Sequence, residues 1–219
     1  MKIIFKITLF SILSFSYNWG QGFNNTQAAT ELRKCLDKNE ACQALADSLT
    51  DAAKRSLKDS ALADFYIKCS YSYFRTGDFA QSKALLAQAA TIDQSLKDTL
   101  LLADCYARVG LNHMYDGKLD SALSFVNQAF KIYEQRKDSV FLGRTILNRG
   151  QILKEKGLYP QALNDYLQGL EIYKALDLKR YEGNALAEIA TLYAMSNEND
   201  KAIAYGRKAA ALFKSLPNG

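Results

Sequence analysis

Hydrophobic residues recur at three- and four-residue steps along most of the chain beyond residue 60, which is the spacing of one face of an α-helix. One such stripe contains Tyr66, Cys69, Ser70 and Tyr73, and equivalent stripes follow at intervals of forty residues. Proline (2) and glycine (12) are scarce for 219 residues, whereas Ala and Leu are abundant. This pattern predicts an all-α fold.

Turn residues follow the same interval. The segments "GDFAQSKA", "GKLDSALS", "GLYPQALN" and "NENDKAIA" begin at Gly77, Gly117, Gly157 and Asn197. Gly and Asn adopt the left-handed backbone conformation at low cost, so each of them is expected to end one helix and lead into the next. The spacing predicts an N-terminal capping half-repeat and then four helix–turn–helix units, over residues 21–60, 61–98, 99–138, 139–178 and 179–219.

The first helix of each unit carries one small residue near its middle. This position holds Ser70, Gly110, Gly150 and Ala190 in turn. A mid-helix glycine costs about 1 kcal/mol of helix propensity, so close packing has to offset that cost. Larger residues on the second helices, Leu86, Val126 and Tyr166, are expected to occupy the space. Small residues facing large ones predict close antiparallel helix pairs.

Composition and charge narrow the class of protein. Hydrophobic residues make up 48% of the chain, which is enough to bury a core and argues against disorder. The net charge is +5, and without Lys2 and Lys6 it falls to 26 basic minus 23 acidic residues, or +3. Basic and acidic residues are interspersed, so the sequence lacks the basic patch of a nucleic-acid-binding protein.

The N-terminus has the pattern of a secretory signal peptide, which we assign to residues 1–20. Lys2 and Lys6 supply positive charge, and Ile7–Phe15 is an apolar stretch too short to span a membrane comfortably. Cleavage would leave an exported periplasmic or secreted chain with no membrane span. The alternative is an uncleaved leader that tethers the chain to the membrane.

Candidate chemistry is sparse. One histidine, His113, cannot form a histidine-based metal cluster, and the glycines are spaced as turns and helix crossings rather than as a phosphate-binding loop. We therefore expect no catalytic residues, no metal and no cofactor. Cys35 and Cys42 either form a disulfide across a tight turn or remain as buried thiols. Cys69 and Cys105 are interpreted as small core residues.

The repeating pattern resembles the tetratricopeptide repeat (TPR) from Ala61 to about Leu216. The family's usual unit has about 34 residues. The forty-residue unit is similar to long-helix members, including exported bacterial TPR proteins and sensor regions. The resemblance implies a right-handed α-solenoid of antiparallel helix pairs, in which the first helices line a concave groove.

In that family the groove binds extended peptides or a helix of a partner protein. Residues between the packing positions are expected to face it, and here these are Tyr71, Phe74, Arg75, Asp104, Leu111, Met114, Tyr115, Arg144, Asn148, Gln151, Lys154, Asn184, Glu188 and Thr191. The aromatic and Met side chains among them suit binding hot spots. The polar side chains between Arg144 and Lys154 suit a carboxylate or polar main-chain groups.

The leading hypothesis is a non-catalytic protein–protein interaction scaffold of the cell envelope. It extends to the extracytoplasmic sensor part of a longer signalling protein, such as a histidine kinase or a helix–turn–helix regulator. The last helix is followed only by "LPNG", so self-association through this uncapped helix is a further expectation. The alternative is a periplasmic component that binds a small molecule or a glycan. The sequence identifies neither the ligand nor the oligomeric state.

Overall fold

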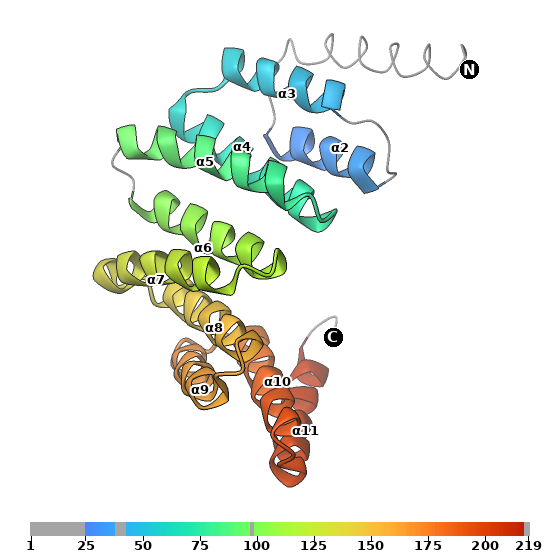
Figure 1. The fold of residues 1–219 in the computed structure, drawn as a ribbon, viewed down its shortest axis with the longest axis vertical. Helices are drawn as coiled ribbons and strands as arrows, with labels where there is room; N and C mark the ends of the chain where they lie inside the picture. The colour runs from blue at the N-terminus through green and yellow to red at the C-terminus, as the bar shows by residue number, and fades with distance from the viewer. Residues whose placement is uncertain (1–24, 38–42, 97–98, 217–219) are drawn as a thin grey trace, which may run out of the picture. The chain divides into compact units, whose positions relative to one another are not determined.

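The structure is a computed structural model, and it describes residues 25–37, 43–96 and 99–216. All regular secondary structure in these ranges is α-helical, so the predicted all-α class is confirmed (Figure 1). The expected signal peptide and Cys42 lie outside the described residues. The helices are α2 (Asn25–Asp37), α3 (Gln43–Ser56), α4 (Asp59–Arg75), α5 (Phe79–Leu96), α6 (Thr99–Tyr115), α7 (Leu119–Arg136), α8 (Ser139–Glu155), α9 (Tyr159–Ala175), α10 (Lys179–Met195) and α11 (Asn199–Ser215).

The chain forms two compact units, the first ending at Cys105 and the second beginning at Tyr106, within α6. In the first unit, α4 packs against α5, and α2 packs mainly against α4 rather than against α3. The stripe predicted on α4 is buried, including Tyr66, Cys69 and Tyr73.

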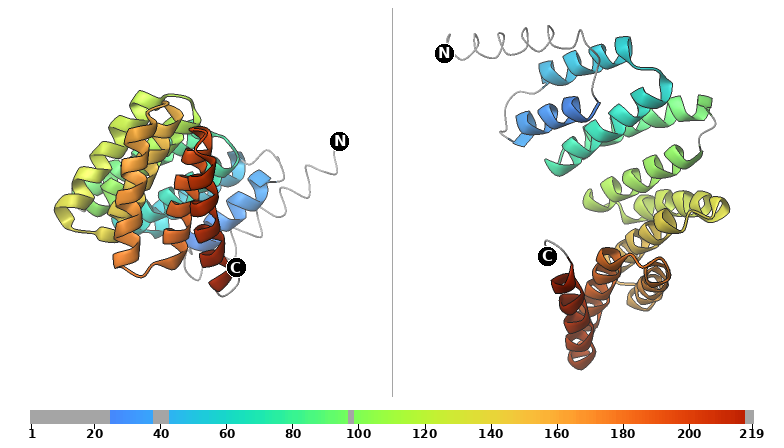
Figure 2. Two further views of the ribbon diagram at one scale, coloured as in Figure 1. Left: turned by 90° about the horizontal axis from the view of Figure 1, so that it is seen from below. Right: turned by 180° about the vertical axis from the view of Figure 1, so that it is seen from behind.

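In the second unit, consecutive helices run antiparallel and pack in sequence, as Figure 2 shows. The pairs α8–α9 and α10–α11 pack within themselves, and α9 also packs against α10. One hydrophobic cluster joins these four helices through Leu153, Tyr166, Ile189 and Ala209. The predicted antiparallel helix pairs are therefore confirmed here.

The four predicted turns adopt the left-handed conformation. Gly77, Gly117 and Gly157 have φ of +82°, +75° and +75°, and Asn197 has φ of +59°. The residue after each turn donates its backbone N–H back to the helix, for example from Lys118 to the His113 carbonyl oxygen at 2.8 Å. These hydrogen bonds satisfy carbonyl groups that a helix end leaves unpaired. They explain why a glycine or asparagine recurs every forty residues.

Two of the small mid-helix residues, Gly110 and Gly150, receive the large partners predicted for them. A Cβ atom built on Gly150 would lie 2.7 Å from Cε1 of Tyr166, and one on Gly110 would lie 2.5 Å from Cγ2 of Val126. A glycine on the second helix of a pair is used in the same way, because a Cβ on Gly169 would lie 2.7 Å from Leu147 Cδ2. Side-chain bulk on one helix thus enters a gap that glycine leaves on the other.

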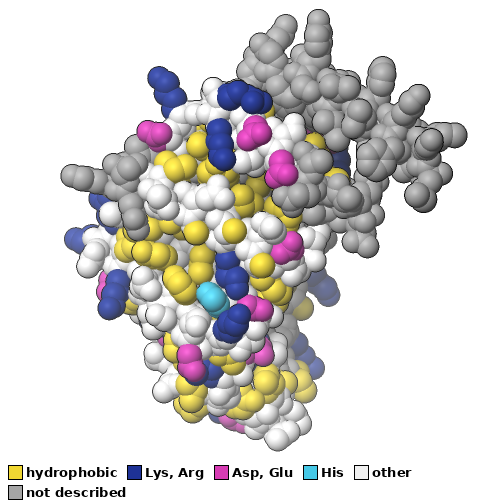
Figure 3. All heavy atoms as spheres, turned by 45° about the horizontal axis from the view of Figure 1, so that its top comes forward, with side chains coloured by type: hydrophobic (Ala, Val, Ile, Leu, Met, Phe, Trp, Pro, Cys, Tyr) yellow, Lys and Arg dark blue, Asp and Glu magenta, His cyan; other side chains and the backbone are white. Residues whose placement is uncertain are grey.

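Charged side chains of both signs are mixed on the face drawn in Figure 3, where neither Lys and Arg nor Asp and Glu gather into a patch among the described residues. No helix in the described ranges has both the length and the hydrophobicity that crossing a membrane requires.

Two alanine substitutions test the packing. Gly150→Ala is expected to lower the free energy of unfolding by about 1–3 kcal/mol, because overpacking against Tyr166 outweighs the gain of about 1 kcal/mol in helix propensity. Gly206→Ala is the matched control, since its nearest neighbour, Ala190 Cβ, would be 3.9 Å away. It should raise stability by up to about 1 kcal/mol. Urea denaturation measures both changes, and equal stabilisation by the two substitutions would contradict the account.

Candidate functional site

The predicted residues on α8 and α10 lie on the first-helix face of the second unit, the face defined by Arg144, Asn148, Gln151, Lys154, Asn184, Glu188 and Thr191. Those on α8 are half-buried, whereas Asn184 and Thr191 on α10 are exposed. Lys154 Nζ donates to Glu188 Oε2 at 2.8 Å, which joins the two helices. The structure therefore brings together two residues that the sequence placed on one surface.

Aromatic rings lie next to two residues of α8, Arg144 and Gly150. The Arg144 guanidinium lies 4.5 Å from the centroid of the Phe141 ring, a cation–π geometry. The Tyr166 ring crosses from α9 to fill the gap at Gly150. Burial, and then the negative charge of Glu188, raise the pKa of the Tyr166 hydroxyl above its usual value. This hydroxyl is therefore neutral at any physiological pH.

Four predicted residues belong to the first unit. Tyr71 is 43% exposed, and its ring stacks on Phe74 with centroids 6.4 Å apart. Phe74 also contacts Phe79 at 5.8 Å between ring centroids, Arg75 is exposed and Asp104 is half-buried. The Tyr71 and Phe74 rings thus form one aromatic surface, and Tyr71 is its exposed part.

The expectation that Met114 faces solvent is wrong. It is 7% exposed and packs with Val126 and Ile152 in a core cluster, against which Leu111 is half-buried. This position of α6 faces the following helices, where an unbranched thioether fills the irregular space. Tyr115, the next residue, is 56% exposed, as expected for a side chain that points away from that cluster.

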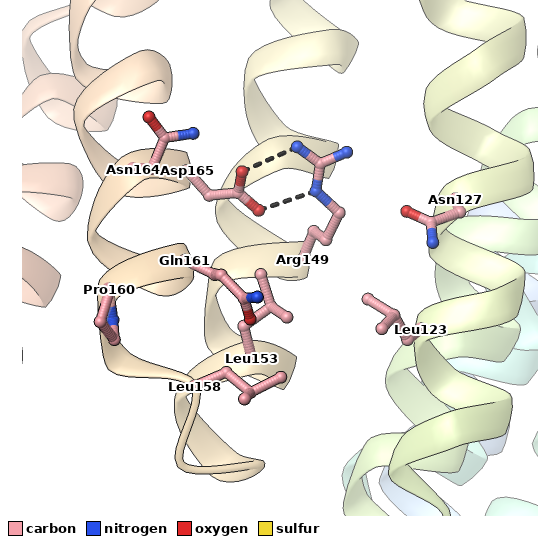
Figure 4. Close-up of a pocket in the computed structure, with 9 residues that line it drawn as sticks. All are labelled: Leu123, Asn127, Arg149, Leu153, Leu158, Pro160, Gln161, Asn164 and Asp165. Carbon is pink, nitrogen blue, oxygen red and sulfur yellow. Dashed lines mark hydrogen bonds and ion pairs between the residues drawn. The ribbon is translucent and has the colours of Figure 1, made fainter.

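A pocket of about 620 Å³, open to solvent, lies elsewhere in the second unit (Figure 4). It is bounded by α7, α8 and α9, and its apolar part consists of Leu123, Leu153, Leu158 and Pro160. On a helix with about 100° per residue, Arg149 and Leu153 point about 150° away from Asn148 and Gln151. The pocket and the first-helix face thus use opposite sides of α8.

An ion pair forms one wall of the pocket. Arg149 donates from Nε and Nη2 to the two carboxylate oxygens of Asp165, both at 2.7 Å (Figure 4). The guanidinium lies 4.5 Å from the Phe130 ring centroid, and the Asp165 side chain is only 4% exposed. The hydrogen-bonded carboxylate raises the pKa of Arg149, so the guanidinium stays charged, and the bidentate contact sets its positive charge against the negative charge of the Asp165 carboxylate.

Three side-chain amides line the remainder of the pocket, those of Asn127, Gln161 and Asn164. None of them makes a side-chain hydrogen bond to another residue within the described ranges. Each amide offers both donors and an acceptor, so together they form a polar surface beside an apolar floor.

None of the fourteen residues predicted from the sequence lines this pocket. One signal was available. Arg149 immediately precedes Gly150, and Asp165 immediately precedes Tyr166. Since Gly150 was expected to receive Tyr166, an arginine and an aspartate beside that contact were positioned to form a pair.

The cysteines and the histidine are placed as structural residues. Cys35 is disulfide-bonded, but Cys42 lies outside the described residues, so their pairing stays a prediction. Cys69 and Cys105 are buried and form no disulfide, and burial raises the pKa of the Cys69 thiol to about 12. His113 stacks on Phe125 with ring centroids 5.3 Å apart. In the described part of the chain, no group of His, Cys, Asp and Glu is arranged to hold a metal ion.

Comparison with known proteins identifies the class of repeat. The tetratricopeptide repeat family model matches residues 142–215, about a third of the 219 residues. The matched segment contains most of α8 and all of α9 and α10, and it ends with α11. The predicted resemblance is therefore confirmed for this segment.

Solved structures share the fold. Aspartyl phosphate phosphatase F from Bacillus subtilis is similar with a TM-score of 0.77 and 19% identity, over 85% of this chain and 50% of that one. The Rap conjugation gene regulator of plasmid pLS20, in complex with the Phr* peptide, gives 0.68 and 16%, over 85% and 50%. A signal transduction ATPase with a tetratricopeptide repeat sensor from Pyrococcus horikoshii gives 0.68 and 22%, over 77% and 26%.

These similarities extend the fold assignment beyond the matched segment to most of the chain. This chain spans about half of the first two proteins and about a quarter of the third. Because every identity is below 25%, the similarity establishes a TPR-like arrangement of helix pairs and not a shared ligand.

Asp165→Ala tests the ion pair. The substitution should lower the free energy of unfolding by about 3 kcal/mol, because it leaves the partly buried Arg149 without its carboxylate. Glu171→Ala, which breaks the exposed Lys174–Glu171 pair, is the control and should change stability by less than about 0.5 kcal/mol. Urea denaturation that gives the same small change for both variants would show that the Arg149–Asp165 pair contributes nothing to the packing of α8 on α9.

Proposed function

We propose that this protein is a non-catalytic scaffold that binds a peptide or a segment of a protein partner along the first-helix face. The observation that carries the proposal is the Lys154–Glu188 ion pair, which fixes α8 and α10 side by side with their predicted binding residues on one surface. A rigid surface built on packed helices lowers the entropy cost of binding.

The chemistry of the face suits a polypeptide. Asn148, Gln151 and Asn184 make no side-chain hydrogen bond to another described residue, so their amides are available to main-chain N–H and C=O groups. Among the residues that define the face, the Lys154 and Glu188 charges compensate each other and Arg144 adds one positive charge, which suits a polypeptide that presents a carboxylate. The Rap regulator whose structure holds the Phr* peptide has the same fold, which supports a peptide as the ligand class here.

Removal of two amides tests this site. The probe is a phage-displayed library of random nine-residue peptides, selected on the wild-type protein. At least one class of the selected peptides, called first-helix-face peptides below, should bind the Asn148→Ala/Asn184→Ala variant about tenfold more weakly than the wild type. This factor corresponds to the loss of about 1.4 kcal/mol in hydrogen bonding. The melting temperature should change by no more than about 2 °C, because both side chains lack hydrogen-bond partners among the described residues.

Gln168→Ala, on an exposed position of α9, is the control and should leave the affinity of these peptides unchanged. If every selected peptide binds the double variant as well as it binds the wild type, the first-helix face is not the binding site.

We further propose that the protein works in the cell envelope, as the extracytoplasmic sensor part of a longer signalling protein. The leader-like pattern of residues 1–20 and the forty-residue units support this location. A TPR sensor in the signal transduction ATPase provides a precedent for the role in a protein of this fold.

Export has a direct test. Expressed in a bacterium with its own N-terminus, the protein should appear in the periplasmic fraction, and mass spectrometry should find a mature chain that begins near Gln21. A chain that retains Met1 and stays in the cytoplasmic fraction would contradict export.

Binding of a glycan is the second candidate function. It is favoured by the exposed Tyr71 ring, which stacks on Phe74 and offers a flat apolar surface to a sugar. A rise in melting temperature with oligosaccharides that is lost in Tyr71→Ala would support the glycan, and the absence of any rise would exclude it.

A further inference from the structure

We infer that the pocket bounded by α7, α8 and α9 is a second binding site, on the side of α8 opposite the first-helix face. Its ligand is an extended, uncharged peptide segment that inserts one aliphatic side chain of leucine or methionine size. This inference goes beyond the proposed function and does not depend on it, because the two sites share no residue.

The size and floor of the pocket favour a segment over a single small group. Its volume of about 620 Å³ falls within the range of about 300–1,000 Å³ that is usual for ligand sites. Leu123, Leu153 and Leu158 provide an aliphatic floor, and Leu158 is 37% exposed. Covering these side chains with another aliphatic group would remove apolar surface from water, which favours binding.

The polar rim matches a peptide main chain. Asn127 on α7 and Gln161 on α9 lie on opposite sides of the pocket, and both amides lack partners among the described residues (Figure 4). A carboxamide can donate to a main-chain carbonyl while it accepts from a main-chain N–H. An extended segment between α7 and α9 would satisfy both amides, whereas a purely apolar ligand would leave them desolvated and unpaired.

The charges of the pocket argue against an anionic ligand. Asp165 binds the Nε and Nη2 groups of Arg149 and cancels its charge. The remaining guanidinium nitrogen, Nη1, is not engaged by Asp165 and points away from it in Figure 4. This nitrogen is therefore suited to donate one hydrogen bond to a neutral carbonyl oxygen. The Phe130 ring, beneath the guanidinium, holds the group in place.

The pocket also differs from a sugar-binding site. Among the described residues that line it, none is aromatic. The nearby Phe130 ring is covered by the Arg149 guanidinium, so it does not offer a free face for stacking on a sugar. An aliphatic floor with amide groups at its edge is the chemistry that recognises a peptide.

The peptide library described above also tests this site. Gln161→Trp places a large ring in the pocket from an exposed position, and Asn127→Ala removes one amide. Selection on the wild type should yield a class of uncharged peptides with a shared Leu, Ile or Met. Their affinity should fall at least tenfold with Gln161→Trp and several-fold with Asn127→Ala.

Two controls separate this site from the first-helix face. Gln168→Trp makes the same substitution two turns further along α9, at an exposed position outside the pocket, and should leave the affinity within twofold. Asn148→Ala/Asn184→Ala should also leave this class of peptides unaffected. Circular dichroism should give Gln161→Trp and Gln168→Trp the same melting temperature within about 2 °C, which separates blocked binding from unfolding.

The inference is overturned if no selected peptide loses affinity with Gln161→Trp. It is also overturned if the peptides that do lose affinity are consistently acidic, because the Arg149–Asp165 pair would then act as an anion site. Loss of the first-helix-face class alone would overturn the proposed function and leave this inference standing.

Discussion

The contact between Gly150 and Tyr166 shows the constraint on which the rest of the structure depends. Because glycine has no side chain, the Tyr166 ring of α9 can lie directly against the backbone of α8. The same relation holds between Gly110 and Val126 one repeat earlier, at the equivalent forty-residue positions. The pairs α6–α7 and α8–α9 are thereby each fixed at one depth and one rotation, so the side chains beside the contact are fixed as well.

Both candidate surfaces follow from that fixed rotation of α8. Residues next to the contact, Arg149 on α8 and Asp165 on α9, are forced close together and pair within the pocket wall. Residues on the other side of α8 point away from α9, where Lys154 reaches Glu188 on α10. The packing of one helix therefore supplies a pocket with an aliphatic floor and an amide rim on one side, and a second polar face on the other.

Much of this arrangement could be predicted from the sequence, because its causes are local. The left-handed backbone conformation is costly for most residue types, so glycine and asparagine indicate where it occurs. Their spacing alone locates the turns at Gly77, Gly117, Gly157 and Asn197. Yet Lys137 and Asp177 end second helices in the same left-handed conformation, with φ of +55° and +54°, and neither is a residue type that signals it strongly.

The remaining features depend on contacts between distant segments. The position of Met114 on α6 alone predicts exposure to solvent, whereas Ile152 of α8 packs with it in a core cluster. The pocket could not be predicted because its walls come from three helices. The hydrophobic periodicity of the sequence predicts the buried face of a single helix and not how three helices meet. Arg149 and Asp165 are sixteen residues apart in the sequence, and the packing of α8 on α9 is what brings their side chains together.

A double-mutant cycle on Gly110 and Val126 tests the central claim most directly. If bulk on α7 occupies the gap left by glycine on α6, Gly110→Ala and Val126→Ala should each destabilise the protein, since one adds a clash and the other leaves a cavity. In the double variant the new methyl group enters the space that Val126 vacates. The combined loss measured by urea denaturation should therefore be smaller than the sum of the two by at least about 1 kcal/mol. Additivity within about 0.5 kcal/mol would contradict the account.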